Sequence, residues 1–164
     1  MPERDYVEET LTVAHSGVFD FNSLYQAMKK WFKQYKYNLQ ELDYKDRKED
    51  GIRKLKIKWQ AKRKISDYVR YVIQTTLEIN NFSDVLVEKK KRAKGDLKIT
   101  SQAYLEKDYE ETWYRSSFIK FMREVYDKFA QGSQFDAMEK ELKQEVNKLV
   151  HEIKVHLNLL QPRD

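Results

Sequence analysis

The side chains that most often bind metal ions are scarce in this chain. Cysteine is absent, and the three histidines are His15, His151 and His156. On a helix of about 3.6 residues per turn, the side chains of His151 and His156 point about 140° apart, so they cannot bind one ion together. No HExxH spacing occurs, and His156 falls among apolar residues at helical spacing, where packing is its ordinary role. We therefore expect no metal site, and we find no cofactor motif.

Groups for covalent or acid–base catalysis are also sparse. No GxSxG motif occurs, and the four glycines fall at predicted turns or element ends, which leaves no glycine-rich loop for a phosphate. One acidic cluster could hold a general acid and a general base, but its place at a strand end and a helix entry favours solvated carboxylates or lysine partners. We expect that the protein is not an enzyme. The cluster consists of Glu106, Asp108, Glu110 and Glu111.

The most conspicuous charged pattern is the stretch KLKIKWQAKRKI at residues 54–65, in which lysines alternate with mostly apolar residues. The side chains of a β-strand alternate between its two faces, so a strand here would place the lysines on one face and Trp59 on the other. Two interpretations stay open. The lysines are the solvated face of a sheet, with Glu41, Asp43 and Glu78 as cross-strand partners, or they bind nucleic acid or another anion.

The nucleic-acid interpretation draws on further cations and on two tyrosines. Tyr68 and Tyr104 fall on the predicted lysine side, where they would stack on bases. Trp59 is predicted on the apolar side and no RNA-binding signature is present, so the solvated interpretation is favoured. The run from Lys89 to Lys94 is typical of a basic loop that holds RNA, anionic lipid or a localisation receptor. The candidate anion-binding residues are Lys54, Lys56, Lys58, Lys62, Lys64, Arg70, Lys89, Lys90, Lys91, Arg92 and Lys94.

Periodicity predicts the elements that position these residues. Apolar residues at spacings of three and four indicate a helix at residues 22–36, with Asn22 or Asp20 as its cap. From residue 37 to residue 107 the period is two, which indicates antiparallel strands. Asp50-Gly51 predicts a two-residue hairpin turn. That turn would pair Tyr44 with Ile57, Leu42 with Trp59, and Asp43 with Lys58.

The remaining strands follow from the same alternation. A loop at residues 66–68 would pair Lys56 with Glu78 and would require a left-handed conformation at Asp67. The segments INNFSD and KKRAKG are predicted as turns on either side of a short strand, VLVEK. These assignments give a five-strand meander, and residues 10–15 add a short edge strand. The predicted fold is α+β, with an antiparallel sheet of five or six strands covered on one face by helices.

Two helices are predicted after the sheet, at residues 116–131 and 134–160, and Gly132 is expected to end the first. The second has apolar residues that alternate steps of three and four, as in a heptad seam. We expect its last turns to pack against a helix of the same chain or of a second protomer, with self-association slightly favoured. The candidate self-association residues are Leu149, Ile153, His156 and Leu160.

Length and composition bound the function. A chain of 164 residues suits a single domain, 1–164, in which we expect residues 1–9 to be loose. The absence of cysteine and of a long apolar run predicts a cytoplasmic protein without a membrane span. A net charge of +5 is a modest excess, which favours a binding module with a protein partner over a nucleic-acid-binding protein. A third interpretation rests on element order alone, which is similar in outline to helix-grip proteins that hold apolar ligands between sheet and helix.

Overall fold

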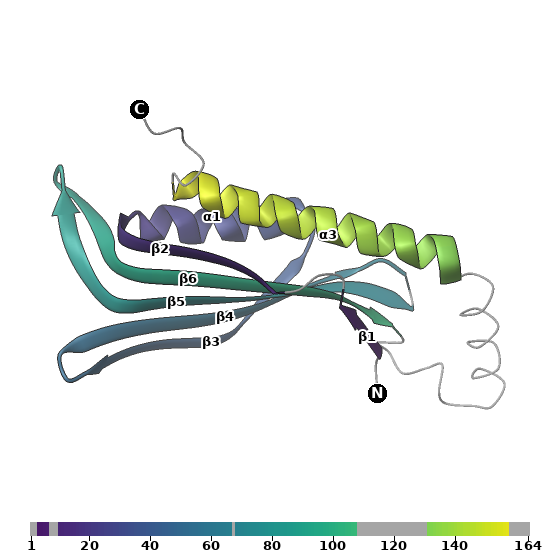
Figure 1. The fold of residues 1–164 in the computed structure, drawn as a ribbon, viewed down its shortest axis with the longest axis horizontal. Helices are drawn as coiled ribbons and strands as arrows, with labels where there is room; N and C mark the ends of the chain where they lie inside the picture. The colour runs from purple at the N-terminus through teal and green to yellow at the C-terminus, as the bar shows by residue number, and fades with distance from the viewer. Residues whose placement is uncertain (1–2, 7–9, 67, 108–130, 158–164) are drawn as a thin grey trace.

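The computed structural model describes residues 3–6, 10–66, 68–107 and 131–157. Within these ranges the fold is α+β, as predicted, with a six-stranded antiparallel sheet and two helices (Figure 1). The strands are hydrogen-bonded in the order β1-β6-β5-β4-β3, and β2 also pairs with β6. The elements are β1 (Glu3–Tyr6), β2 (Leu11–Phe19), α1 (Phe21–Gln34), β3 (Asn38–Glu49), β4 (Ile52–Lys64), β5 (Val69–Val87), β6 (Lys90–Lys107) and α3 (Gln131–His156).

The β3–β4 hairpin turns where the sequence predicts. Asp50 and Gly51 have φ angles of 52° and 78°, the left-handed values that a two-residue turn of this kind requires. The predicted pairing of Tyr44 with Ile57 is confirmed. Local turn chemistry therefore sets the register of the first half of this hairpin.

Further along the hairpin the predicted register is wrong, because β3 contains a β-bulge. Asp43 pairs with Lys58 as predicted, but the register shifts between Glu41 and Asp43, so Glu41 and not Leu42 lies opposite Trp59. Leu42 is 52% exposed, and the Glu41 carboxylate accepts a 3.0 Å hydrogen bond from the Trp59 indole N–H. The bulge thus gives a buried donor its partner, and a donor left unpaired would cost about 1–3 kcal/mol.

The turn between β4 and β5 agrees with the prediction. Lys56 pairs with Glu78, and the Ser66 hydroxyl accepts a 3.1 Å hydrogen bond from the Val69 N–H. A side chain that satisfies backbone donors in this way stabilises a short loop. The predicted conformation of Asp67 lies outside the described residues.

The two turns predicted after residue 79 are wrong. β5 continues through a register shift between Asn80 and Ser83, and its hairpin with β6 turns at Glu88 and Lys89, whose φ angles are 51° and 67°. A Cβ at Gly95 would lie 2.8 Å from the Asn80 carbonyl oxygen, so this glycine allows the strands to approach closely at the bulge. The run predicted as a basic loop is therefore mostly strand β6. The meander has four strands, β3 to β6, rather than five.

β1 and β2 complete the sheet along the other edge of β6. β2 extends the edge strand predicted at residues 10–15, and β1 pairs Tyr6 with Tyr104. The expectation that residues 1–9 are loose is corrected for Glu3–Tyr6, which form β1. A strand of four residues is too short to show an alternation of apolar and polar residues, so β1 is recognised only by its pairing with β6.

The helices differ in how well their ends were predicted. Asp20 caps α1, as predicted, because its carboxylate accepts a 3.1 Å hydrogen bond from the Ser23 N–H. α3 begins at Gln131, so Gly132, predicted as a helix end, lies inside it. One glycine costs a helix only about 1 kcal/mol, which the packing of a long helix outweighs. The helix predicted at residues 116–131 falls, except for its last residue, outside the described residues.

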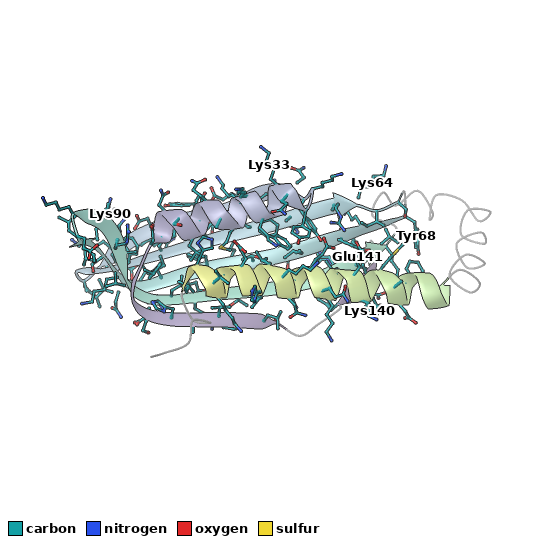
Figure 2. The ribbon with its side chains drawn as sticks, turned by 90° about the horizontal axis from the view of Figure 1, so that it is seen from above. Lys33, Lys64, Tyr68, Lys90, Lys140 and Glu141 are labelled. Atoms are coloured by element: carbon teal, nitrogen blue, oxygen red, sulfur yellow. The ribbon has the colours of Figure 1, made fainter. Side chains whose placement is uncertain are left out.

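The core joins the odd-numbered residues of β4 to both helices. α1 and α3 run side by side along the same side of the sheet in both views (Figures 1 and 2). The Trp59 ring lies 6.2 Å from the Phe32 ring of α1, so Trp59 faces a helix as predicted. α3 contributes Leu142, Val146, Leu149 and Ile153 to the same core. Neither of the two described helices has the length and apolar character needed to cross a bilayer.

Candidate binding surface

The even-numbered residues of β4 form the centre of a polar surface on the side opposite Trp59. Strand pairing extends it in rows across the sheet; one row runs from Asp43 through Lys58 to Thr76. We call this surface the lysine face. Its exposed and half-buried members are Asn38, Gln40, Asp43, Lys45, Arg47, Lys54, Lys56, Lys58, Gln60, Lys62, Lys64, Arg70, Gln74, Thr76, Glu78, Lys98, Thr100 and Gln102. Val72, Tyr104 and Glu106 fall on the same side of the sheet but are buried.

Some cations of the lysine face have carboxylate partners. Lys56 lies 3.7 Å from Glu78, as the cross-strand prediction requires, and Lys45 lies 3.4 Å from Asp43. Such exposed pairs contribute only about 0–1 kcal/mol each. Within the described residues, four lysines of this face form no ion pair, and we call them the unpaired lysines. They are Lys54, Lys58, Lys62 and Lys98.

A row of four glutamines crosses the middle of the lysine face. Gln60 of β4 lies between Gln40 and Gln74, and Gln74 lies opposite Gln102. Each amide offers two donors and an acceptor. At about 3.3 Å per residue, Lys58 and Lys62 stand about 13 Å apart on either side of this row. The row was missed from the sequence because four glutamines on four strands become neighbours only once the register is known.

The two predicted stacking platforms are not on the surface. Tyr68 is 3% exposed and Tyr104 is 1% exposed. The Tyr68 ring lies 6.4 Å from Phe135 of α3, and the Tyr104 ring lies 5.1 Å from Tyr6 of β1. The prediction is therefore wrong for both residues, because the strand β1 and the start of α3 cover them. Bases cannot stack on either ring in this conformation.

The predicted anion-binding residues separate into two groups. The six from Lys54 to Arg70 lie on the lysine face, whereas the run from Lys89 to Lys94 begins at the tip of the β5–β6 hairpin. Figure 2 shows Lys90 and Lys64 at opposite ends of the molecule. Arg92 lies 3.4 Å from the carboxylate of Asp20, the cap of α1. The structure therefore does not assemble one continuous cationic site from all the predicted residues.

Arg63 differs from the lysines beside it, because its side chain points to the helix side and forms ion pairs with two carboxylates of α3. Its guanidinium donates to both carboxylate oxygens of Glu145 at 2.6 and 3.0 Å, to Glu141 at 3.1 Å and to the Tyr35 carbonyl at 2.9 Å. Burial raises the pKa of Glu145, and the hydrogen bonds from Arg63 act in the opposite direction. Burial also raises the pKa of the neighbouring Tyr37 hydroxyl. This cluster ties β4 to α3, and the sequence analysis missed it.

The residues predicted for self-association, and Glu106 of the predicted acidic cluster, contact other residues of the same chain where the structure describes them. Leu149 and Ile153 are fully buried in the chain's own core, so the intramolecular alternative accounts for both, and His156 lies 3.3 Å from Glu152. Leu160, Asp108, Glu110 and Glu111 lie outside the described residues. Glu106 is buried and accepts a hydrogen bond from Arg70. No three potential metal ligands come together in the part of the chain that the structure describes.

Comparisons with known proteins do not assign the chain to a family. No family model matches it, and no curated protein matches it. A solved structure of an uncharacterized protein from Rhizobium leguminosarum aligns over 94% of this chain and 98% of that chain, with 10% identity and a TM-score of 0.21. A score this low supports no argument about fold or function.

Proposed function

We propose that this chain is a non-enzymatic binding module whose lysine face contacts an acidic protein surface. The observation that carries the proposal is the unpaired lysines around a neutral row of glutamines. Protein interfaces commonly have a core depleted of charge and a charged, solvated rim. The glutamine amides supply donors and acceptors at the centre, and the lysines supply charge at the edge, where it steers the approach of an acidic partner.

A protein partner is favoured over nucleic acid by three features. Tyr68 and Tyr104 are buried, and Trp59 lies on the helix side, so aromatic stacking has no platform among these residues. Carboxylates are interleaved with the lysines, as at Asp43 and Glu78, and they would repel a continuous phosphate backbone. A protein surface carries charges of both signs, so it can match such a mixed pattern.

We also infer that α1 and α3 together close the helix side of the sheet. This inference is supported by the contacts of Trp59 with Phe32 and Tyr25, and by the burial of Leu149 and Ile153. These side chains occupy space that an apolar ligand between sheet and helices would need. The helix-grip alternative is therefore the least favoured of the three functions.

The proposal can be tested with two polyanions of defined chemistry, poly-L-glutamate and single-stranded oligo-dT. We expect poly-L-glutamate to bind at low salt, and the triple variant Lys58→Glu, Lys62→Glu, Lys98→Glu to lose at least tenfold in affinity. A matched control reverses the same number of charges on the helices, at Lys30, Lys33 and Lys140, and should change affinity less than threefold. Circular dichroism confirms that both variants are folded.

Two outcomes would overturn the proposal. If oligo-dT binds more tightly than poly-L-glutamate, with a log–log salt slope of about −0.7 per phosphate contact, the face is a nucleic-acid site. If the two triple variants lose affinity equally, the binding reflects net charge and not this surface.

A further inference from the structure

A hollow of about 390 Å³ lies on the lysine face at the end of the β3–β4 hairpin. Four cations line it, and two carboxylates, Glu49 and Glu78, stand among them. Ile52, which is 45% exposed, provides an apolar wall. Volumes of about 300–1,000 Å³ are typical of small-molecule sites. The cations are Lys45, Arg47, Lys54 and Lys56.

The strand register brings these cations together in an unfavourable way. Lys45 lies directly opposite Lys56, and Arg47 lies directly opposite Lys54, so two consecutive cross-strand pairs on one face have like charge. Like charges in this position destabilise a sheet, with Cβ atoms only about 4.5–5.5 Å apart. A local conflict of this kind, close to a turn that agrees with its sequence, is typical of a functional site.

The conflict is only partly relieved within the chain. Lys45 has Asp43 at 3.4 Å and Lys56 has Glu78 at 3.7 Å. Among the described residues, Arg47 and Lys54 form no ion pair. The second like-charge pair therefore lacks an internal counterion, and an anion bound in the hollow would supply one.

We propose that this hollow binds a phosphomonoester group, which goes beyond the acidic protein partner proposed above. The lining has an excess of two positive charges, which matches the charge of about −1.5 to −2 that a phosphomonoester carries at pH 7. Arg47 offers a planar fork of donors for two phosphate oxygens, and the lysines add point charges. Ile52 would contact the organic part of the ester. The group can belong to a small metabolite or to a phosphorylated side chain of a partner protein.

The test uses isothermal titration calorimetry with phenyl phosphate and with a phosphoserine peptide, each at low salt. We expect the double variant Arg47→Gln, Lys54→Gln to weaken binding of both ligands at least tenfold. The matched control Lys30→Gln, Lys33→Gln removes the same charge from α1, outside both proposed binding surfaces, and should change affinity less than threefold. Equal affinity for the two ligands identifies the ester group as sufficient, and tighter binding of the peptide identifies a protein source; both support the site.

A second readout separates this site from an ordinary charged surface. Without ligand, Arg47→Gln, Lys54→Gln should unfold at the same or a higher temperature than the wild type, because it removes a like-charge pair. Lys30 and Lys33 lie on α1 and not in the sheet, so the control removes no cross-strand like-charge pair. No binding of either ligand, an equal loss in both variants, or a lower unfolding temperature for the first variant would overturn the proposal. The acidic-partner proposal does not depend on these outcomes, since it is tested at Lys58, Lys62 and Lys98.

Discussion

The two faces of β4 differ in burial and in ion pairing, although their residues alternate along one strand. On the helix side, Ile57 and Trp59 are 2% and 4% exposed, and both terminal nitrogens of Arg63 donate hydrogen bonds. On the lysine face, Lys58 and Lys62 have no ion-pair partner among the described residues. Charge on the helix side thus joins β4 to α3, whereas we propose that the unpaired lysines of the lysine face contact a partner.

The largest expected effect comes from breaking the buried ion pair. Glu145→Ala should lower the free energy of unfolding by about 3–5 kcal/mol, because the partly buried Arg63 would lose its bidentate partner and keep only the exposed Glu141 as a counterion. Glu141→Ala is the matched control, since that carboxylate is 58% exposed and its loss should cost about 0–1 kcal/mol. Urea unfolding measures both. Equal costs for the two variants would show that the cluster does not anchor α3.

A pair of neighbouring substitutions compares the two faces directly. Ile57→Ala should cost about 2–5 kcal/mol, since it removes a core side chain and leaves a cavity. Lys58→Ala, one residue further on the opposite face, should change stability by less than about 0.5 kcal/mol. The same denaturant titration applies to both. A large cost for Lys58→Ala would mean that the lysine face has a structural role that this account omits.

The smallest expected effect is a pH dependence at the β3–β4 hairpin. Arg53 donates hydrogen bonds of 3.0 and 2.8 Å to Asp46, and they lower the pKa of that carboxyl below its ordinary value of 3.8. A lowered folded-state pKa contributes stability above the ordinary value, and this stability is lost as the pH falls through the folded pKa. The contribution should be about 0.2–1 kcal/mol, because the pair is largely exposed. Unfolding of wild type and Asp46→Asn between pH 2 and about pH 5 checks this, and parallel curves would contradict it.

The parts of the fold that could be predicted are those set by local signals. Asp50-Gly51 defined a hairpin turn, and the loop predicted at residues 66–68 defined the pairing of Lys56 with Glu78. The bulge opposite Trp59 could not be predicted, because it depends on a hydrogen bond between that indole and Glu41 across two strands. The bulge at residues 80–83 was misread as a turn, because its asparagines are typical of both.

The candidate binding surface also has features that could be predicted from the sequence and features that could not. The lysines could be placed on one face because a strand has a period of two. Tyr104 is on the predicted side of the sheet, but its predicted exposure is wrong, because its burial depends on β1, a strand too short to have a recognisable period. Arg63 belongs to the same stretch as the lysines, and only the docking of α3 distinguishes it from them. Long-range contacts of this kind leave no pattern in a single sequence.

The most direct test of the binding surface is lysine acetylation with and without saturating poly-L-glutamate, measured residue by residue by mass spectrometry. We expect the ligand to slow acetylation of Lys58, Lys62 and Lys98 severalfold. Lys33 and Lys140, which lie on the helices in Figure 2, should react at an unchanged rate. Equal protection of the helix lysines, or no protection of the lysine face, would contradict the account.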